Sequence, residues 1–166
     1  TLVAGPVNLP TPKGVKRIDV ESALEMQSAV EAEVAQHPIF IGCAAVADYR
    51  MAEVAPQKMK KTEGQEGLSL QLIKNPDIIA GVAARTDKPF VVGFAAETQD
   101  VARYALDKLQ RKGLDMIAAN DVSRAEQGFN ADQNALTVFW QNAQQGLPLA
   151  SKQQVAQQLI SLIIQR

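Results

Sequence analysis

Apolar and polar positions in this chain follow two alternating spacings. Short apolar runs typical of strands are separated by stretches in which apolar residues recur every three or four positions, as on one helix face. This order predicts an α/β, Rossmann-like protein, with a mostly parallel sheet covered by helices on both faces. The strands are expected at residues 1–4, 17–20, 39–43, 90–94 and 114–117, with a small antiparallel C-terminal extension at 135–140 and 147–149.

Capping residues mark the expected helix ends. Thr98 is expected to cap a helix that runs to Lys112 and is stopped by Gly113. Asn75 is expected to cap another that continues through Pro76 and Asp77. Two further pairs have the spacing of a capping box at a helix start: Ser22 with Glu25, and Ser151 with Gln154.

A polar stretch at residues 53–67, which we call the flap, interrupts the strand and helix pattern. It carries a lysine cluster, which consists of Lys58, Lys60 and Lys61. Residues 68–73 alternate between apolar and polar positions and predict a strand that leads the chain back.

Composition narrows the choice of function. The 166 residues suit a single domain, and the net charge of −1 argues against a dedicated nucleic-acid binder. A lone cysteine, Cys43, and a lone histidine, His37, exclude a disulfide within the chain and a metal site of clustered cysteines or histidines, so no protein metal site is expected. No apolar run is long enough to span a bilayer, and the cysteine content suits a reducing cytoplasm.

Three of the expected strands end in small residues, at 42–45, 93–96 and 118–120. In open parallel sheets, ligands bind outside the carboxyl ends of the strands. Small side chains there leave backbone N–H and C=O groups free to read the edge of a base. The alternative interpretation is that small residues only allow tight turns.

Several side chains near these ends suit a nucleoside triphosphate. Asp48 follows the strand at 39–43 and is placed for a sugar hydroxyl, while the lysine cluster is suited to phosphate oxygens. Lys108 and Lys112 share one helix face. The alternatives are a turn-forming aspartate and solvated surface lysines.

Other features near the strand ends are less specific. Phe94 can stack on a base or belong to the core, and the pair Asn120 and Asp121 suits either a polar contact or a turn. The sequence contains neither the glycine fingerprint of dinucleotide sites nor a P-loop, which disfavours a nicotinamide oxidoreductase.

Five short motifs, taken in order, resemble phosphopantothenoylcysteine synthetase. This enzyme is usually the C-terminal half of a bifunctional bacterial coenzyme A biosynthesis protein, behind a flavin-dependent decarboxylase. The resemblance covers nearly the whole chain. The motifs are AAVADYR at residues 44–50, KMKK at 58–61, KNPDI at 74–78, VGFAAET at 92–98 and ANDV at 119–122.

The resemblance implies a cytoplasmic ligase that joins 4′-phosphopantothenate to cysteine with CTP. It implies Mg²⁺ on the triphosphate, with FMN only in the decarboxylase half. The balanced charge and the short apolar runs predict no nucleic-acid or membrane partner. A homodimer is expected, with Leu136 and Trp140 as candidates for burial against the second copy.

The resemblance also implies roles for individual residues. Lys58 contacts the nucleotide and is the expected catalytic residue, and Asp48 binds CTP. Gly42, Cys43 and Ala44 contact the nucleotide through their backbone. The remaining nucleotide-binding residues line the base pocket or complete the site: Pro76, Asp77, Ile78, Ile79, Phe94, Lys108 and Lys112.

One departure from the family is expected to matter. The family has an upstream strand and a Gly/Ser-rich loop with an asparagine that handles the acyl-cytidylate, and residues 1–166 show no equivalent. A single ligase domain that lacks this segment is therefore expected to bind CTP without completing the ligation. The alternatives are a ligase that uses ATP and a non-catalytic module for nucleotide binding or dimerisation.

Overall fold

The computed structural model describes residues 1–60, 64, 66–123 and 131–166. Contacts along the chain divide it into two compact units. Residues 1–30 and 44–78 form the first unit, and residues 31–43 and 79–166 form the second. The expectation of a single domain over residues 1–166 stays a prediction.

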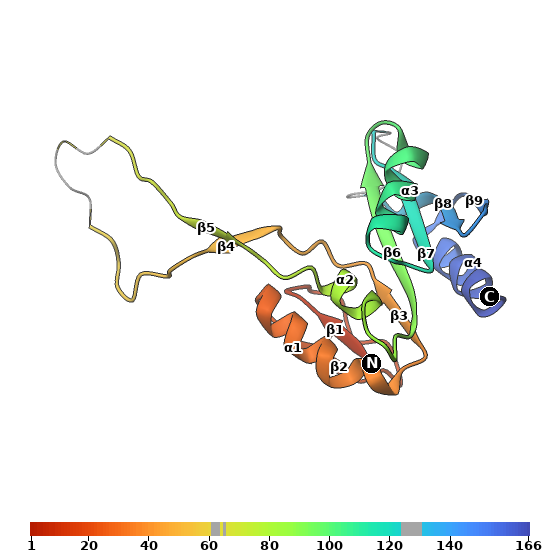
Figure 1. The fold of residues 1–166 in the computed structure, drawn as a ribbon, viewed down its shortest axis with the longest axis horizontal. Coiled ribbons are helices and arrows are strands. Elements are labelled where there is room, and N and C mark those ends of the chain that lie inside the picture. The colour runs from red at the N-terminus through yellow and green to blue at the C-terminus, as the bar shows by residue number, and fades with distance from the viewer. Residues whose placement is uncertain (61–63, 65, 124–130) are drawn as a thin grey trace. The chain divides into compact units, whose positions relative to one another are not determined.

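Within the described residues, the second unit contains a five-stranded sheet in the order β3-β6-β7-β8-β9 (Figure 1). The first three of these strands are parallel, and β8 and β9 continue the sheet antiparallel. This confirms the predicted parallel core and its antiparallel C-terminal extension. The strands are β3 (Ile39–Gly42), β6 (Phe90–Glu97), β7 (Met116–Asp121), β8 (Gln133–Trp140) and β9 (Ala143–Ser151).

Helices cover both faces of this sheet, as predicted. Successive strand residues point to opposite faces, so each strand can contribute side chains to an apolar layer on each face of the sheet. On one face, α4 (Lys152–Ile164) packs against a fully buried row that includes Met116 and Val138. The alternate residues, such as Ile117, are also fully buried, beneath the face that α3 (Val101–Arg111) covers.

Leu136 belongs to the layer beneath α4 and is 5% exposed. The expectation that it faces a second copy of the chain is therefore wrong, because its side chain is already buried within one chain. Trp140 is half-buried, and the guanidinium of Arg166 lies 4.1 Å from the centre of its ring.

The edge position of β3 corrects a second expectation. The run at 39–43 was expected to be buried, but Ile39 is 38% exposed and Ile41 is 36% exposed. The reason is that β3 pairs with β6 on one side only, so it lies at the edge of the sheet.

The two ends of α3 show one correct prediction and one error. Thr98 does not cap the helix, because α3 begins at Val101 and Asp100 takes the cap position in a left-handed conformation (φ 47°). At the other end, Gly113 N–H donates to the Gln110 carbonyl and Leu114 N–H donates to the Leu109 carbonyl. This is a Schellman motif, which confirms Gly113 as the helix terminator.

We expect Gly113→Ala to lower the free energy of unfolding by about 1 kcal/mol, because a Cβ is disfavoured in the left-handed region. Gly113 has a φ of +64°. The matched control is Gly146→Ala in β9, where an added Cβ meets nothing within 4 Å. Urea titration of both variants tests this, and equal midpoints for the two would contradict the role of Gly113.

The first unit contains two short strand pairs. β1 (Leu2–Ala4) and β2 (Arg17–Asp19) are parallel, while β4 (Tyr49–Met51) and β5 (Leu72–Lys74) are antiparallel and join the two ends of the flap (Figure 1). β5 is shorter than the strand expected at 68–73, and the sequence pattern missed β4.

α1 (Ala23–Glu33) begins in the first unit with the predicted capping box. Glu25 N–H donates to Ser22 Oγ at 3.2 Å, and Ser22 N–H donates to Glu25 Oε2 at 3.4 Å. A second backbone donor, Glu21 N–H, lies 2.8 Å from the same carboxylate oxygen. A short 3-10 helix (Val34–Gln36) then ends the helical segment ahead of Pro38, as expected.

These backbone hydrogen bonds hold the pKa of Glu25 below its ordinary value. A lowered pKa adds stability above the unfolded-state pKa of about 4.3, and this stability is lost as the pH falls through the folded-state pKa. We expect Glu25→Gln to flatten the acid side of the stability profile below about pH 4.3.

Melting curves between pH 3 and pH 6 test this expectation. Asp87→Asn is the comparison variant, because a hydrogen bond from Arg85 lowers the pKa of Asp87 as well. If Glu25→Gln lost as much stability in acid as the unmodified chain does, the assignment of this linkage to Glu25 would be wrong.

Candidate functional site

Small residues meet at the carboxyl edge of the three parallel strands. Gly42 of β3 pairs with Gly93 of β6, and Ala96 of β6 pairs with Asn120 of β7. The strand ends predicted to form a ligand site are therefore adjacent in the second unit, at the edge where ligands of parallel sheets bind.

Two of these small residues also make room for a helix. A Cβ on Gly42 would lie 3.0 Å from Ile79 Cδ1, and a Cβ on Gly93 would lie 3.1 Å from the same atom. Ile79 belongs to α2 (Ile78–Ala83). Gly42 and Gly93 therefore allow α2 to pack closely against β3 and β6. Close helix packing thus explains these two glycines without a tight turn.

A lysine reaches the same edge from α3. Lys108 Nζ donates to the backbone carbonyl of Phe94 at 2.9 Å, so this ammonium lies beside the carboxyl half of β6. The Phe94 ring is partly buried and packs against the core on the α4 face. Lys112 is half-buried and is the residue that caps the C-terminal end of α3.

Asp48 lies in the first unit, beside a polar clamp at the base of the flap. Asn75 N–H donates to the Asp48 carbonyl at 2.8 Å, and Asn75 Nδ2 donates to the Ala47 carbonyl at 2.8 Å. Arg50 donates in turn to the Lys74 carbonyl and to Asn75 Oδ1. We call these three residues, Ala47, Arg50 and Asn75, the Asn75 clamp.

The Asn75 clamp corrects a predicted helix start. Asn75 was expected to cap a helix that includes Pro76 and Asp77, but α2 begins at Ile78. The side-chain amide of Asn75 instead donates a hydrogen bond to the carbonyl of Ala47, 28 residues earlier in the chain. A partner at that distance could not be read from the local sequence.

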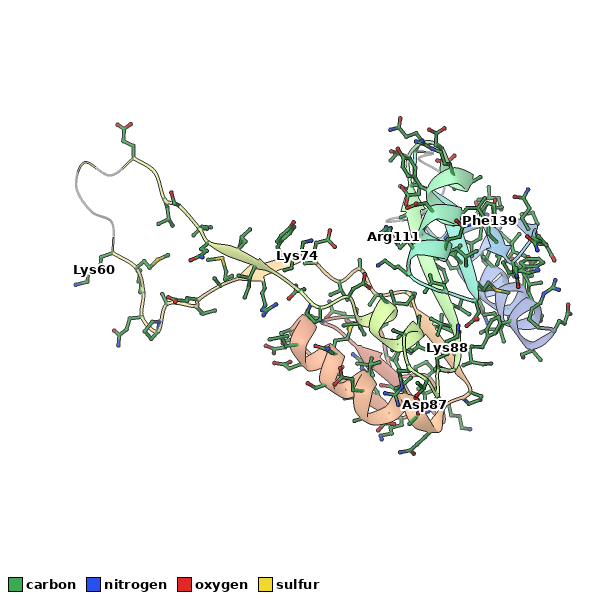
Figure 2. All side chains as sticks on the ribbon, in the orientation of Figure 1. Lys60, Lys74, Asp87, Lys88, Arg111 and Phe139 are labelled. Atoms are coloured by element: carbon green, nitrogen blue, oxygen red, sulfur yellow. The ribbon has the colours of Figure 1, made fainter. Side chains whose placement is uncertain are left out.

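The described lysines of the cluster, Lys58 and Lys60, are exposed on the flap. Figure 2 shows Lys60 far along the flap from Lys74, which ends β5. Lys61, the third member of the lysine cluster, lies outside the described residues. Exposed ammonium groups on an extended segment suit a mobile anion such as a polyphosphate.

The predicted nucleotide-binding residues are divided between the two units, and their roles stay predictions. The second unit holds Gly42, Cys43, Ile79, Phe94, Lys108 and Lys112. The first unit holds Ala44, Asp48, Lys58, Pro76, Asp77 and Ile78.

The sequence left two interpretations open for Asn120 and Asp121, a polar contact or a turn. The structure gives these two neighbours different surroundings. Asp121 accepts hydrogen bonds from the backbone and hydroxyl of Ser123, as a turn residue does. Asn120 is only 8% exposed, and its Oδ1 has no hydrogen-bond partner among the atoms that the structure describes.

A groove in the described part of the second unit lies away from these residues. It has a volume of about 980 Å³ and contacts Phe90 and Trp140, and Phe90 begins β6 at the amino end of the sheet. None of the predicted nucleotide-binding residues lines it. Over residues 1–60, 64, 66–123 and 131–166, no three His, Cys, Asp or Glu side chains gather as a metal site.

A mostly parallel sheet covered by helices on both faces, with small residues near its strand ends, defines an α/β protein of the open-sheet class, in which ligands bind at the carboxyl edge of the strands. The chain belongs to the family of DNA/pantothenate metabolism flavoprotein C-terminal domains, whose model matches residues 1–166. The resemblance that the five motifs indicated is confirmed.

Relatives with a curated name support this membership. The chain is 61% identical over 164 residues to the coenzyme A biosynthesis bifunctional protein CoaBC of Vibrio cholerae, covering 98% of this chain and 41% of that protein. It is 41% identical over 164 residues to the CoaBC of Bacillus subtilis, covering 98% of this chain and 40% of that protein. The chain thus spans about two fifths of the length of these relatives.

Solved structures agree. A crystal structure of the C-terminal domain of a CoaBC protein superposes with a TM-score of 0.78 at 33% identity, covering 98% of this chain and 71% of that chain. The DNA/pantothenate metabolism flavoprotein from Streptococcus pneumoniae has the same fold, with a TM-score of 0.77 at 18% identity over 99% of this chain and 80% of that chain. No helix in the described ranges is both long and apolar enough to cross a membrane.

Proposed function

We propose that this chain is a ligase domain that joins 4′-phosphopantothenate to cysteine with CTP. The observation that carries the proposal is the 61% identity to a CoaBC protein over 98% of the chain. The motifs of phosphopantothenoylcysteine synthetase, found in order along the sequence, supply the reaction.

The proposed reaction has two steps. The carboxylate of 4′-phosphopantothenate attacks the α-phosphate of CTP, which forms an acyl-cytidylate and releases pyrophosphate. The amine of cysteine then attacks the acyl carbon, forms the amide and displaces CMP. Since the nucleotide supplies the leaving groups, the protein is left to position the reactants and to stabilise developing charge.

The chain's own groups suit these tasks. Backbone groups of Gly42, Cys43 and Ala44, and of residues 76–79, would bind the nucleotide, and Asp48 would take a ribose hydroxyl. Lys108 is already held beside the carboxyl half of β6 by its hydrogen bond to the Phe94 carbonyl. Lys58, a positively charged residue of the flap, would bind the phosphates of CTP and assist transfer of the cytidylyl group to the carboxylate.

Mg²⁺ fits as a companion of CTP rather than as an ion held by a protein cage. It keeps several waters and prefers phosphate oxygens with one or two carboxylates, so a cluster of acidic side chains is not required. FMN would belong to a decarboxylase half outside these residues. We also propose a cytoplasmic location, a homodimer and no nucleic-acid partner.

Calorimetric titration with CTP and then ATP, in magnesium, tests the nucleotide part of the proposal. A ligation assay with 4′-phosphopantothenate and cysteine, following CMP release, tests the chemistry. CTP binding and CMP release are expected in the intact protein that carries this chain. Equal use of ATP would favour an ATP-dependent ligase, and binding without turnover would favour a non-catalytic nucleotide-binding module.

A further inference from the structure

Asn120 carries a buried hydrogen-bond acceptor that the described chain does not use. Its side chain is 8% exposed, and Oδ1 has no partner among the described atoms. Buried amide oxygens are nearly always paired, because leaving one without a partner disfavours the folded state. An asparagine with a purely structural role would be expected to use this oxygen within the chain.

Asn120 lies at the sheet edge where ligands of open parallel sheets bind. It lies near the carboxyl end of β7, opposite Ala96 of β6. Strand alternation places it on the same face as Ala118, and Ala118 pairs with Phe94. The groups beside it on β6 and β7 are thus small or aromatic, and none of these side chains offers a donor to Oδ1.

Neighbouring polar residues do not supply the missing donor. Ser123 gives both its N–H and its hydroxyl to Asp121. Asn134, at the start of β8, uses its own Oδ1 to accept the N–H of Ala135 at 2.9 Å. The unused acceptor is therefore specific to Asn120, at the edge where the three parallel strands end.

We propose that Asn120 is a substrate-binding residue, whose Oδ1 accepts a hydrogen bond from an N–H or O–H group of a bound substrate. This inference rests on the proposed ligase function. Each of the three substrates carries such a donor: CTP in its cytosine amino group and ribose hydroxyls, 4′-phosphopantothenate in its hydroxyl and amide, and cysteine in its amine. The substrate whose KM changes identifies the source.

The test uses Asn120→Leu, a change of similar size that removes the acceptor, in the intact protein. We expect the KM for one of the three substrates to rise about tenfold, while the other two stay within a few-fold. We also expect the ligand-free Tm to rise by a few degrees, because a buried unpaired oxygen is replaced by an apolar group.

Asn134→Leu is the matched control, since the Oδ1 of Asn134 is already paired. It is expected to leave all three KM values unchanged and to lower the Tm. If Asn120→Leu does not fold, Asn120→Ala removes the same acceptor without adding bulk, and its KM values decide the outcome.

Unchanged KM values for all three substrates in the Asn120 variants, with active unmodified protein, would overturn the inference and leave the ligase function intact. If the unmodified protein binds CTP but releases no CMP, or binds no CTP, the proposed function fails first. The substrate role of Asn120 then fails with it.

Discussion

Lys58→Gln is expected to lower the rate of CTP-dependent ligation by about 100-fold, the scale on which removing one charge-stabilising donor slows a reaction. Glutamine keeps most of the length of lysine but loses the positive charge that would meet the phosphates. Lys58 is exposed on the flap and lies in no helix or strand, so the melting temperature is expected to stay unchanged. CMP release at saturating substrates measures the effect.

Lys60→Gln is the matched control, because Lys60 is an exposed lysine on the same segment. If both variants slowed equally, the flap would act through its total charge rather than through Lys58. Unchanged turnover and unchanged CTP affinity in Lys58→Gln would remove this lysine from the catalytic machinery.

Gly93→Ala is expected to lower the free energy of unfolding by about 2 kcal/mol, because it overpacks a filled site. The added Cβ would lie 2.7 Å from Leu114 Cδ1 and 3.1 Å from Ile79 Cδ1. Leu114 is buried, so its side chain has little room to yield. Because Ile79 would be pushed from its position over the sheet, CTP affinity is expected to fall as well.

Gly81→Ala provides a control of opposite sign. Gly81 lies within α2, where an added Cβ meets nothing within 4 Å. Alanine favours a helix over glycine by about 1 kcal/mol, so this variant is expected to gain stability. Urea midpoints measure both changes, and a stable Gly93→Ala protein would show that Leu114 and Ile79 repack freely.

Much of the fold could be predicted because its signals are local. The capping boxes at Ser22 and Ser151 and the helix end at Gly113 depend on partners three to five residues away, and the structure reproduces all three. The apolar run that became β6 was long enough to specify a central strand. The order of strands and helices then left few arrangements of the sheet.

The errors came from partners distant in sequence. Asn75 has the composition of a helix cap, but its amide is taken by Ala47, and no local pattern records that contact. Thr98 has the composition of a cap as well, but β6 continues to Glu97 by pairing with Asp121 of β7, and α3 starts only at Val101. The run at 39–43 reads as a buried strand, and only its edge position in the sheet explains its exposure.

The candidate site was predicted more by chemistry than by geometry. Small strand ends and nearby lysines pointed to the carboxyl edge, and the structure does bring Gly42 beside Gly93 and Lys108 to the Phe94 carbonyl. The burial of Asn120 was not accessible from the sequence, since an asparagine before an aspartate has the composition of a turn. A polar residue within a small-residue strand end is the only signal that could have indicated it.

The Asn75 clamp makes the position of Asp48 independent of the length of the flap that carries the lysines. Its hydrogen bonds join the chain before the flap to the chain after it, at Ala47 and Asn75. Closing a longer loop adds only about 0.6 kcal/mol for each doubling of its length. Residues inserted into the flap would therefore leave Asp48 where it is, so the reach of the lysines and the place of the aspartate can be altered independently in engineered variants.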